Sequence, residues 1–154
     1  MNIKKISEIL KDREFVSVGT CDFEGAPNVA PKFLLKVDNE CIYLIDYSVG
    51  RTFRNIKINP KVSLSIMDLE TIVGYQLNGS VGIIDEGPLY HKIIEELSQK
   101  EVELSAKRVI EALGKGKRHK NFEVSLSQTV IILKVHIDEI VELSINGETK
   151  RHKI

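Results

Sequence analysis

The residues with the clearest chemical potential lie in one short segment, 46–52, which joins an apolar run to a helix-like stretch. The N-terminus of a helix has unpaired backbone N–H groups and the positive end of the helix dipole, so it attracts anions. The hydroxyls of Ser48 and Thr52 and the planar guanidinium of Arg51 add donors that suit a phosphate monoester. The alternative interpretation is an ordinary helix that Ser48 caps, with Arg51 exposed to solvent.

No standard catalytic signature accompanies this segment. The sequence has no Walker loop, dinucleotide fingerprint, zinc-ligand spacing or nucleophile-elbow serine. We therefore predict no metal site and nominate no catalytic residue. Cys21 and Cys41 lack metal-ligand spacing and are interpreted as reduced thiols, although the sequence leaves a disulfide between them open. The four histidines lie far apart and are interpreted as packing or surface residues: His91, His119, His136 and His152.

Length and composition predict one globular domain over residues 1–154. The chain is 42% hydrophobic and 29% charged, which is ordinary for such a domain. The formal net charge is zero, with 22 basic and 22 acidic residues, and this balance disfavours nucleic acid or a membrane surface as partner. No apolar run reaches the roughly 20 residues that span a bilayer, and the N-terminus lacks the apolar centre of a signal peptide. We therefore expect a cytoplasmic protein.

Hydrophobic periodicity predicts a mainly β chain of the α+β class. Alternating or apolar runs indicate strands, and apolar residues at helical spacing indicate helices. Gly79 and Gly82 interrupt one strand and suit a barrel corner or a close backbone approach to a ligand. Asn146-Gly147 predicts a type I′ hairpin turn. The predicted strands are 15–20, 29–37, 41–46, 62–66, 75–84, 129–137 and 139–145, and the predicted helices are 1–11, a short one after Ser48 that ends at Asn59, and 88–113.

Three segments together resemble the FMN-binding split barrels of the pyridoxamine phosphate oxidase-like family. Gly19-Thr20 followed by 22–33 is similar to the opening hairpin pattern, "G-T… D-x-x-G-x-P-x-x-x-P". Residues 45–66 are similar to the family's strand, basic phosphate-binding loop, "N-[IL]-x-x-N-P-x-V" helix end and next strand. Residues 77–81 are similar to the following "x-x-G-x-A/V" strand. The resemblance covers about residues 15–86 and implies an antiparallel split β-barrel of the Greek-key type.

The resemblance also implies a homodimer with FMN at the subunit interface. Arg51 and Thr52 would bind the FMN phosphate, with Ser48 nearby, and Asp46 and Tyr47 would follow the isoalloxazine or ribityl chain. Many family members carry Lys where Thr52 stands, whereas others have a basic residue followed by Thr, as here. The full set of implied cofactor-binding residues is Pro31, Lys32, Phe33, Ile45, Asp46, Tyr47, Ser48, Arg51 and Thr52.

Lys32 carries a more specific hypothesis, because the implied flavin passes beside residues 31–33. Its ammonium could stabilise negative charge on a reduced flavin in a partly desolvated slot. The competing interpretation is that Lys32 points to solvent from an alternating strand.

The predicted function is that of an FMN-dependent oxidoreductase that moves hydride or electrons between a nicotinamide or other small donor and a small-molecule acceptor. Pyridoxamine phosphate oxidase activity itself is not expected, because that enzyme's C-terminal substrate-binding signature is not recognised here. Helices at 88–113 would cover the interface or substrate mouth, or pack on the barrel exterior.

Three alternatives remain. The first is a non-enzymatic flavin carrier or electron-transfer protein. The second is a nucleic-acid-binding barrel using the basic loop 115–120, which neutral charge and a single nearby aromatic, Phe122, disfavour. The third is a barrel that holds a deazaflavin or haem; no axial ligand for haem is convincing, although His91 or His136 could serve in principle.

Overall fold

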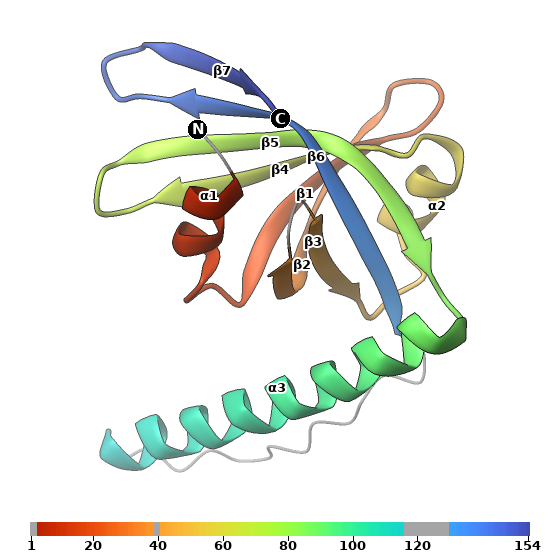
Figure 1. The fold of residues 1–154 in the computed structure, drawn as a ribbon, viewed down its shortest axis with the longest axis vertical. Coiled ribbons are helices and arrows are strands. Elements are labelled where there is room, and N and C mark those ends of the chain that lie inside the picture. Colours follow the sequence, from red (N-terminus) through yellow and green to blue (C-terminus); the bar gives the residue numbers. More distant parts are fainter. Residues whose placement is uncertain (1–2, 39–40, 116–129) are drawn as a thin grey trace. The chain divides into compact units, whose positions relative to one another are not determined.

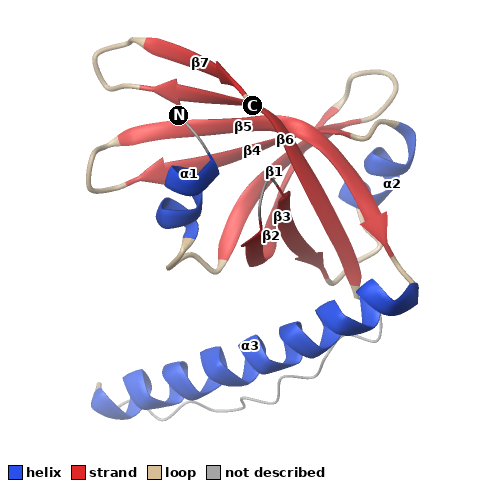
Figure 2. Ribbon diagram, viewed as in Figure 1, coloured by secondary structure: helices blue, strands red, loops and turns tan. Residues whose placement is uncertain are grey.

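The computed structural model describes residues 3–38, 41–115 and 130–154, which form three helices and seven strands (Figures 1 and 2). Most predicted elements are present, with ends shifted by a few residues. In chain order they are α1 Ile3–Leu10, β1 Phe15–Cys21, β2 Pro27–Asp38, β3 Cys41–Asp46, α2 Arg51–Ile58, β4 Lys61–Asp68, β5 Val73–Ile84, α3 Gly87–Gly114, β6 Ile131–Leu143 and β7 Thr149–Lys153.

The strands form an antiparallel barrel of the predicted class. The sheet order is β3-β2-β1-β4-β5-β6-β7, and a further pairing of β3 with β6 closes six strands on themselves. The chain returns through α2 so that β4 lies beside β1, which gives the order β4-β1-β2-β3 of a Greek key. Closure satisfies the edges of β3 and β6, which would otherwise expose unpaired backbone groups.

The barrel interior is filled by apolar residues that alternate along the strands. Val16 and Val18 in β1 and Leu64 in β4 are examples, and each is almost inaccessible to solvent. Helix α1 adds Ile6 and Leu10 to this core, and α2 adds Ile56. Figure 2 shows α1 and α2 on different sides of the barrel. The helices therefore help to close the barrel rather than forming a separate layer.

Gly79 marks a close approach between β5 and β6. The register shifts between Asn78 and Gly79, and a Cβ atom on Gly79 would lie 1.9 Å from the carbonyl oxygen of His136. The close backbone approach predicted for this glycine is therefore made to a neighbouring strand. The shift leaves Asp138 between Ile137 and Glu139 as the extra residue of a β-bulge.

The same bulge corrects one sequence expectation. We predicted separate strands at 129–137 and 139–145, but β6 runs without interruption from Ile131 to Leu143. A bulge accommodates the polar residue Asp138 without ending the strand, because the ladder resumes at Glu139.

The hairpin at Asn146-Gly147 is present, but its turn type differs from the prediction. A type I′ turn needs positive φ at both central residues. Only Gly147 has one, at 83°. Its N–H donates to the carbonyl of Ser144, and the N–H of Ser144 donates to Glu148. This is the pattern of a longer hairpin loop with a left-handed glycine at its end.

The chain divides into two compact units, residues 1–84 with 129–154, and residues 85–128. Helix α3 belongs to the second unit and confirms the helical region predicted at 88–113. Apart from Lys115, the basic loop 115–120 lies outside the described residues, as do Phe122 and the predicted strand start at Thr129. Within the described ranges, no helix combines the length and hydrophobicity that a bilayer crossing requires.

Candidate functional site

The segment 46–52 connects the end of β3 to the start of α2, as predicted. Asp46 is the last residue of β3, Gly50 is the N-cap of α2 and Arg51 is its first helical residue. The alternative in which Ser48 caps this helix is wrong, because α2 has no side-chain cap hydrogen bond. The Ser48 hydroxyl donates instead to Asp46 Oδ1 at 3.0 Å. An ionised carboxylate is a strong acceptor, and it stands two residues before Ser48.

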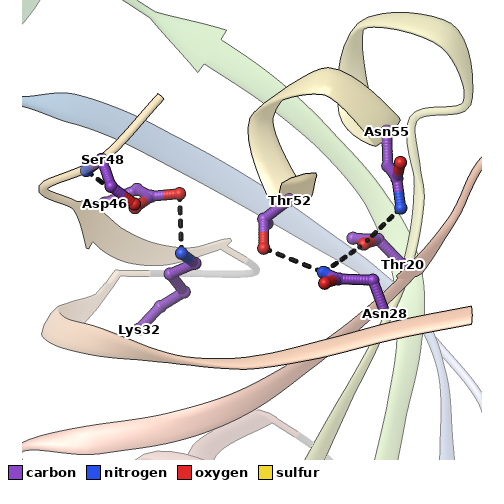
Figure 3. Close-up of polar contacts among 7 residues, drawn as sticks. All are labelled: Thr20, Asn28, Lys32, Asp46, Ser48, Thr52 and Asn55. Carbon is purple, nitrogen blue, oxygen red and sulfur yellow. Dashed lines mark hydrogen bonds and ion pairs between the residues drawn. The ribbon is translucent and has the colours of Figure 1, made fainter. Parts of the chain in front are cut away.

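A buried ion pair lies at the start of this segment (Figure 3). Lys32 Nζ of β2 is 2.7 Å from Asp46 Oδ2 of β3, and the two side chains are 7% and 2% exposed. The other carboxylate oxygen, Oδ1, accepts from the backbone N–H of Ser48 at 3.1 Å as well as from its hydroxyl. The interpretation in which Lys32 points to solvent is therefore wrong.

The register of the barrel explains this pair. Phe33 of β2 lies opposite Ile45 of β3, so one step further along the antiparallel pair brings Lys32 opposite Asp46. Residues opposite each other in this way project from the same face of a sheet. Leu34 and Leu44, on that same face, belong to the apolar core.

A second polar cluster holds α2 against the barrel (Figure 3). Thr20 Oγ1 accepts from Asn28 Nδ2 at 3.2 Å and from Asn55 Nδ2 at 3.1 Å. Asn28 Nδ2 also donates to Thr52 Oγ1 at 3.1 Å. Thr20, Thr52 and Asn55 are all buried. The Thr52 side chain therefore points into the barrel, which leaves its backbone N–H as the group that it presents at the helix N-terminus.

Sequence reasoning did not single out Asn55 or Thr20 as part of a site. The available signal was an amide at position 55, next to the apolar Ile56 that the sequence places on the packed face of the helix. A polar residue on a buried helix face requires a partner inside the protein. The sequence gives no way to identify that partner before the helix is placed on the barrel.

The N-terminus of α2 is open to an anion. It has no side-chain cap and no acidic residue in its first turn. The first helical hydrogen bond runs from Arg54 N–H to Gly50 carbonyl, so the N–H groups of 51–53 have no intrahelical partner. The side chain of Arg51 is exposed, which confirms that part of the alternative interpretation. This arrangement can bind a phosphate through backbone N–H groups and a guanidinium.

Aromatic rings lie in this segment, at Tyr47, and on the strands β2 and β1, at Phe33 and Phe15. The Phe33 ring is 5.7 Å from that of Phe15 in an edge-to-face contact, and 6.5 Å from that of Tyr47. Of the other predicted contact residues, Pro31 is exposed on β2, whereas Ile45 is 1% exposed. The structure therefore brings together Phe33 with Tyr47, and Lys32 with Asp46 and Ser48.

A separate groove of about 560 Å³ lies near the second polar cluster and shares Thr20 and Asn28 with it. This volume is within the usual range for small-molecule sites. None of the nine predicted cofactor-binding residues lines it. Its lining residues are Gly19, Thr20, Cys21, Pro27, Asn28, Val29, Lys61, Val62, Ser63, Asn78, Gly79, Asp138 and Glu139.

One wall of the groove carries an ionised carboxylate. Hydrogen bonds from Asn78 and then from Arg151 stabilise the charged form of Glu139 and hold its pKa below the usual range. The Asn78 amide is 2.8 Å from Glu139 Oε2, and Arg151 lies 3.2 Å from both carboxylate oxygens. Glu139 is thus held by two partners at the edge of the groove.

Comparison with known proteins assigns the family. The model of the pyridoxamine 5'-phosphate oxidase family matches residues 3–124, so the chain belongs to that family. An uncharacterized protein of Methanocaldococcus jannaschii is 31% identical over 102 residues, which are 63% of this chain and 67% of that protein.

Solved structures with the same fold have low sequence identity. A Clostridium acetobutylicum protein related to general stress protein 26, of the pyridoxinephosphate oxidase family, is 17% identical with a TM-score of 0.65. The alignment covers 99% of this chain and 94% of that one. A structure described as F420 reductase is also 17% identical, with a TM-score of 0.56, over 87% of this chain and 94% of that one. These likenesses support the split-barrel fold.

Proposed function

We propose that the chain binds FMN and acts as an oxidoreductase. The observation that carries the proposal is the open N-terminus of α2, which begins at the exposed Arg51, with the Phe33 and Tyr47 rings on the adjoining strand and loop. FMN needs an anion site next to an apolar surface for its flat ring. Membership of the pyridoxamine 5'-phosphate oxidase family supports a flavin-type cofactor.

In this proposal the phosphate binds to the N–H groups of residues 51–53 and to the Arg51 guanidinium. Thr52 contributes its backbone N–H, because its hydroxyl faces Asn28. The flavin ring lies against Pro31, Phe33 and Tyr47, with Ile45 behind them. When bound, the flavin supplies hydride and electron transfer, and the protein supplies binding, orientation and electrostatics.

The reaction proposed is transfer of hydride or electrons from a nicotinamide or other small donor to a small-molecule acceptor. The protein is proposed to work as a cytoplasmic homodimer with the cofactor at the subunit interface. Direct action of Lys32 on a reduced flavin stays a prediction, which the flavin reduction potential in Lys32→Met tests. An unchanged potential would remove that role.

Two variants of the proposal have different chemistry. A flavin carrier would react slowly with every donor and acceptor mixed with it in stopped flow. The second variant holds a deazaflavin in place of FMN, and the likeness to a structure described as F420 reductase supports it. Titration with FMN and with a deazaflavin separates these two cofactors.

The direct test is the visible absorption spectrum of the purified protein, with mass analysis of any chromophore released on denaturation. We expect a flavin spectrum, or tight binding when FMN is added to the colourless protein, and a dimer by light scattering. Failure to bind FMN, riboflavin and a deazaflavin at micromolar protein would overturn the proposed function.

A further inference from the structure

We propose that the Lys32–Asp46 ion pair is a positioning device for the phosphate site, acting through the bend 46–50 that leads into α2. This inference rests on the proposed function, because it concerns the same site. Asp46 is the positioning residue, and Lys32 holds it in place.

The two oxygens of the Asp46 carboxylate have different partners. Oδ2 is held by Lys32 on the neighbouring strand β2, whereas Oδ1 accepts both donors of Ser48, the backbone N–H and the hydroxyl. The carboxylate therefore links a barrel strand to the loop that follows the next strand (Figure 3). A turn in which an aspartate accepts from the N–H two residues later fixes the local backbone direction.

Ser48 consequently contributes to the site through the shape of the loop. Its hydroxyl proton is directed to Asp46, so this hydroxyl has no proton left for a phosphate oxygen. The backbone N–H of Ser48 is engaged in the same way. The bend leads to Gly50, the N-cap of α2. The N–H groups of residues 51–53 follow it and point away from the helix, towards the proposed phosphate.

The ion pair also keeps the net charge near the phosphate site close to zero. Without Lys32, the carboxylate of Asp46 would repel an incoming phosphate. The repulsion would be strong because buried charges are poorly screened. The ammonium of Lys32 at 2.7 Å offsets that charge. The pair thus supplies a strong acceptor for Ser48 without leaving a net negative charge next to the anion site.

The experiment compares the affinities for FMN and for riboflavin, which differ by the phosphate. Fluorescence titration gives both dissociation constants, and their ratio measures the phosphate contribution. The double variant Lys32→Met with Asp46→Ala removes the link without leaving a buried unpaired charge. We expect the riboflavin-to-FMN ratio to fall about tenfold, a loss near that of one charge-assisted hydrogen bond, and the ratio cancels any change that is common to both ligands.

Two further variants keep the test independent of folding. Ser48→Ala removes the hydroxyl but keeps the backbone N–H bond, and we expect the ratio to fall about threefold, as for one ordinary hydrogen bond. Lys32→Met with Asp46→Asn keeps an oxygen acceptor for Ser48 and leaves no buried unpaired charge, so the ratio is not expected to fall. Amide hydrogen exchange of residues 47–52 without any cofactor should quicken in the double variant.

The control is the double variant Lys61→Met with Asp138→Ala, which removes an exposed ion pair of 3.7 Å and changes the charge by the same amounts. Its ratio should match the wild type. If the wild-type protein does not prefer FMN to riboflavin, the proposed phosphate site is wrong. If it does, but the Lys32–Asp46 and Ser48 variants keep the full ratio and the same exchange rates, only the positioning role is wrong.

Discussion

Thr20, at the end of β1, accepts a hydrogen bond from Asn55 of α2 across 3.1 Å, inside the barrel. The contact joins residues that lie 35 positions apart in the chain. Together with the bond from Asn28 to Thr52, it orients α2 on the barrel through directional polar contacts. Apolar packing by Ile56 alone would allow the helix to rotate or slide, because hydrophobic burial is non-directional.

The first prediction concerns this cluster. Thr20→Val keeps the shape of the side chain but removes the acceptor, so the amide groups of Asn28 and Asn55 lose their shared partner. We expect the free energy of unfolding to fall by about 1–3 kcal/mol, the usual cost of buried donors left unsatisfied, in urea denaturation. Thr149→Val, at an exposed position of β7, should change it by less than about 0.5 kcal/mol. Equal effects of the two substitutions would contradict the role of the cluster.

The second prediction tests the phosphate site. Arg51→Met removes the guanidinium beside the N-terminus of α2 and should weaken FMN binding about tenfold to a hundredfold, as for a lost charge-assisted hydrogen bond. Riboflavin binding should be unchanged, because riboflavin has no phosphate. Arg54→Met is the matched control, since Arg54 is also exposed on the same helix but lies one turn further along. Similar losses in both variants would indicate a diffuse charge effect instead of a site.

The third prediction concerns the close approach at Gly79. Gly79→Ala would place a methyl group 1.9 Å from the His136 carbonyl oxygen, so β5 and β6 would have to separate. We expect a loss of about 3 kcal/mol or more in stability, or failure to fold. Gly82→Ala is the control on the same strand, because no atom lies within 4 Å of its added Cβ. The stability of this control should stay the same or rise by about 0.5 kcal/mol. A fully stable Gly79→Ala protein would show that β5 and β6 do not lie this close at Gly79.

The fourth prediction follows from the lowered pKa of Glu139. A pKa that is lower in the folded than in the unfolded state stabilises the protein above the ordinary value of 4.5, and this stabilisation is lost as the pH falls through the lowered pKa. Asn78→Ala should raise the pKa of Glu139 towards its ordinary value. The free energy of unfolding should then fall less steeply as the pH is lowered. Carboxyl NMR titration measures this shift. The pKa of Asp68, which a hydrogen bond from Thr71 lowers, should not move and serves as the internal reference.

Much of the barrel could be predicted from alternation in the sequence. Lys61 to Ile66 alternates polar and apolar residues, and β4 has the matching burial pattern. Pro60 and the preceding Asn59 correctly indicated the end of α2, because proline restricts the residue before it. The open helix start near Arg51 was also predictable, since it depends on local chain direction.

The polar pairings could not be predicted, because they depend on register and closure. Lys32 and Asp46 meet only when Phe33 lies opposite Ile45. A slip of one residue would turn one of the two side chains to the other face. The continuous β6 was missed for a related reason, because Asp138 looks like a strand break until the bulge opposite Gly79 is known.

The pairing of β3 with β6 also sets the order in which the molecule can be completed. Residues 41–46 can pair only after residues 131–136 have been synthesised, and the whole segment 85–128 is synthesised before them. Loop-closure entropy rises only with the logarithm of length, so this long excursion costs little in equilibrium stability. Its cost is kinetic, because non-local strand pairing slows folding. Until β6 has emerged from the ribosome, β3 and β5 present open edges, which expose the nascent chain to edge-to-edge pairing.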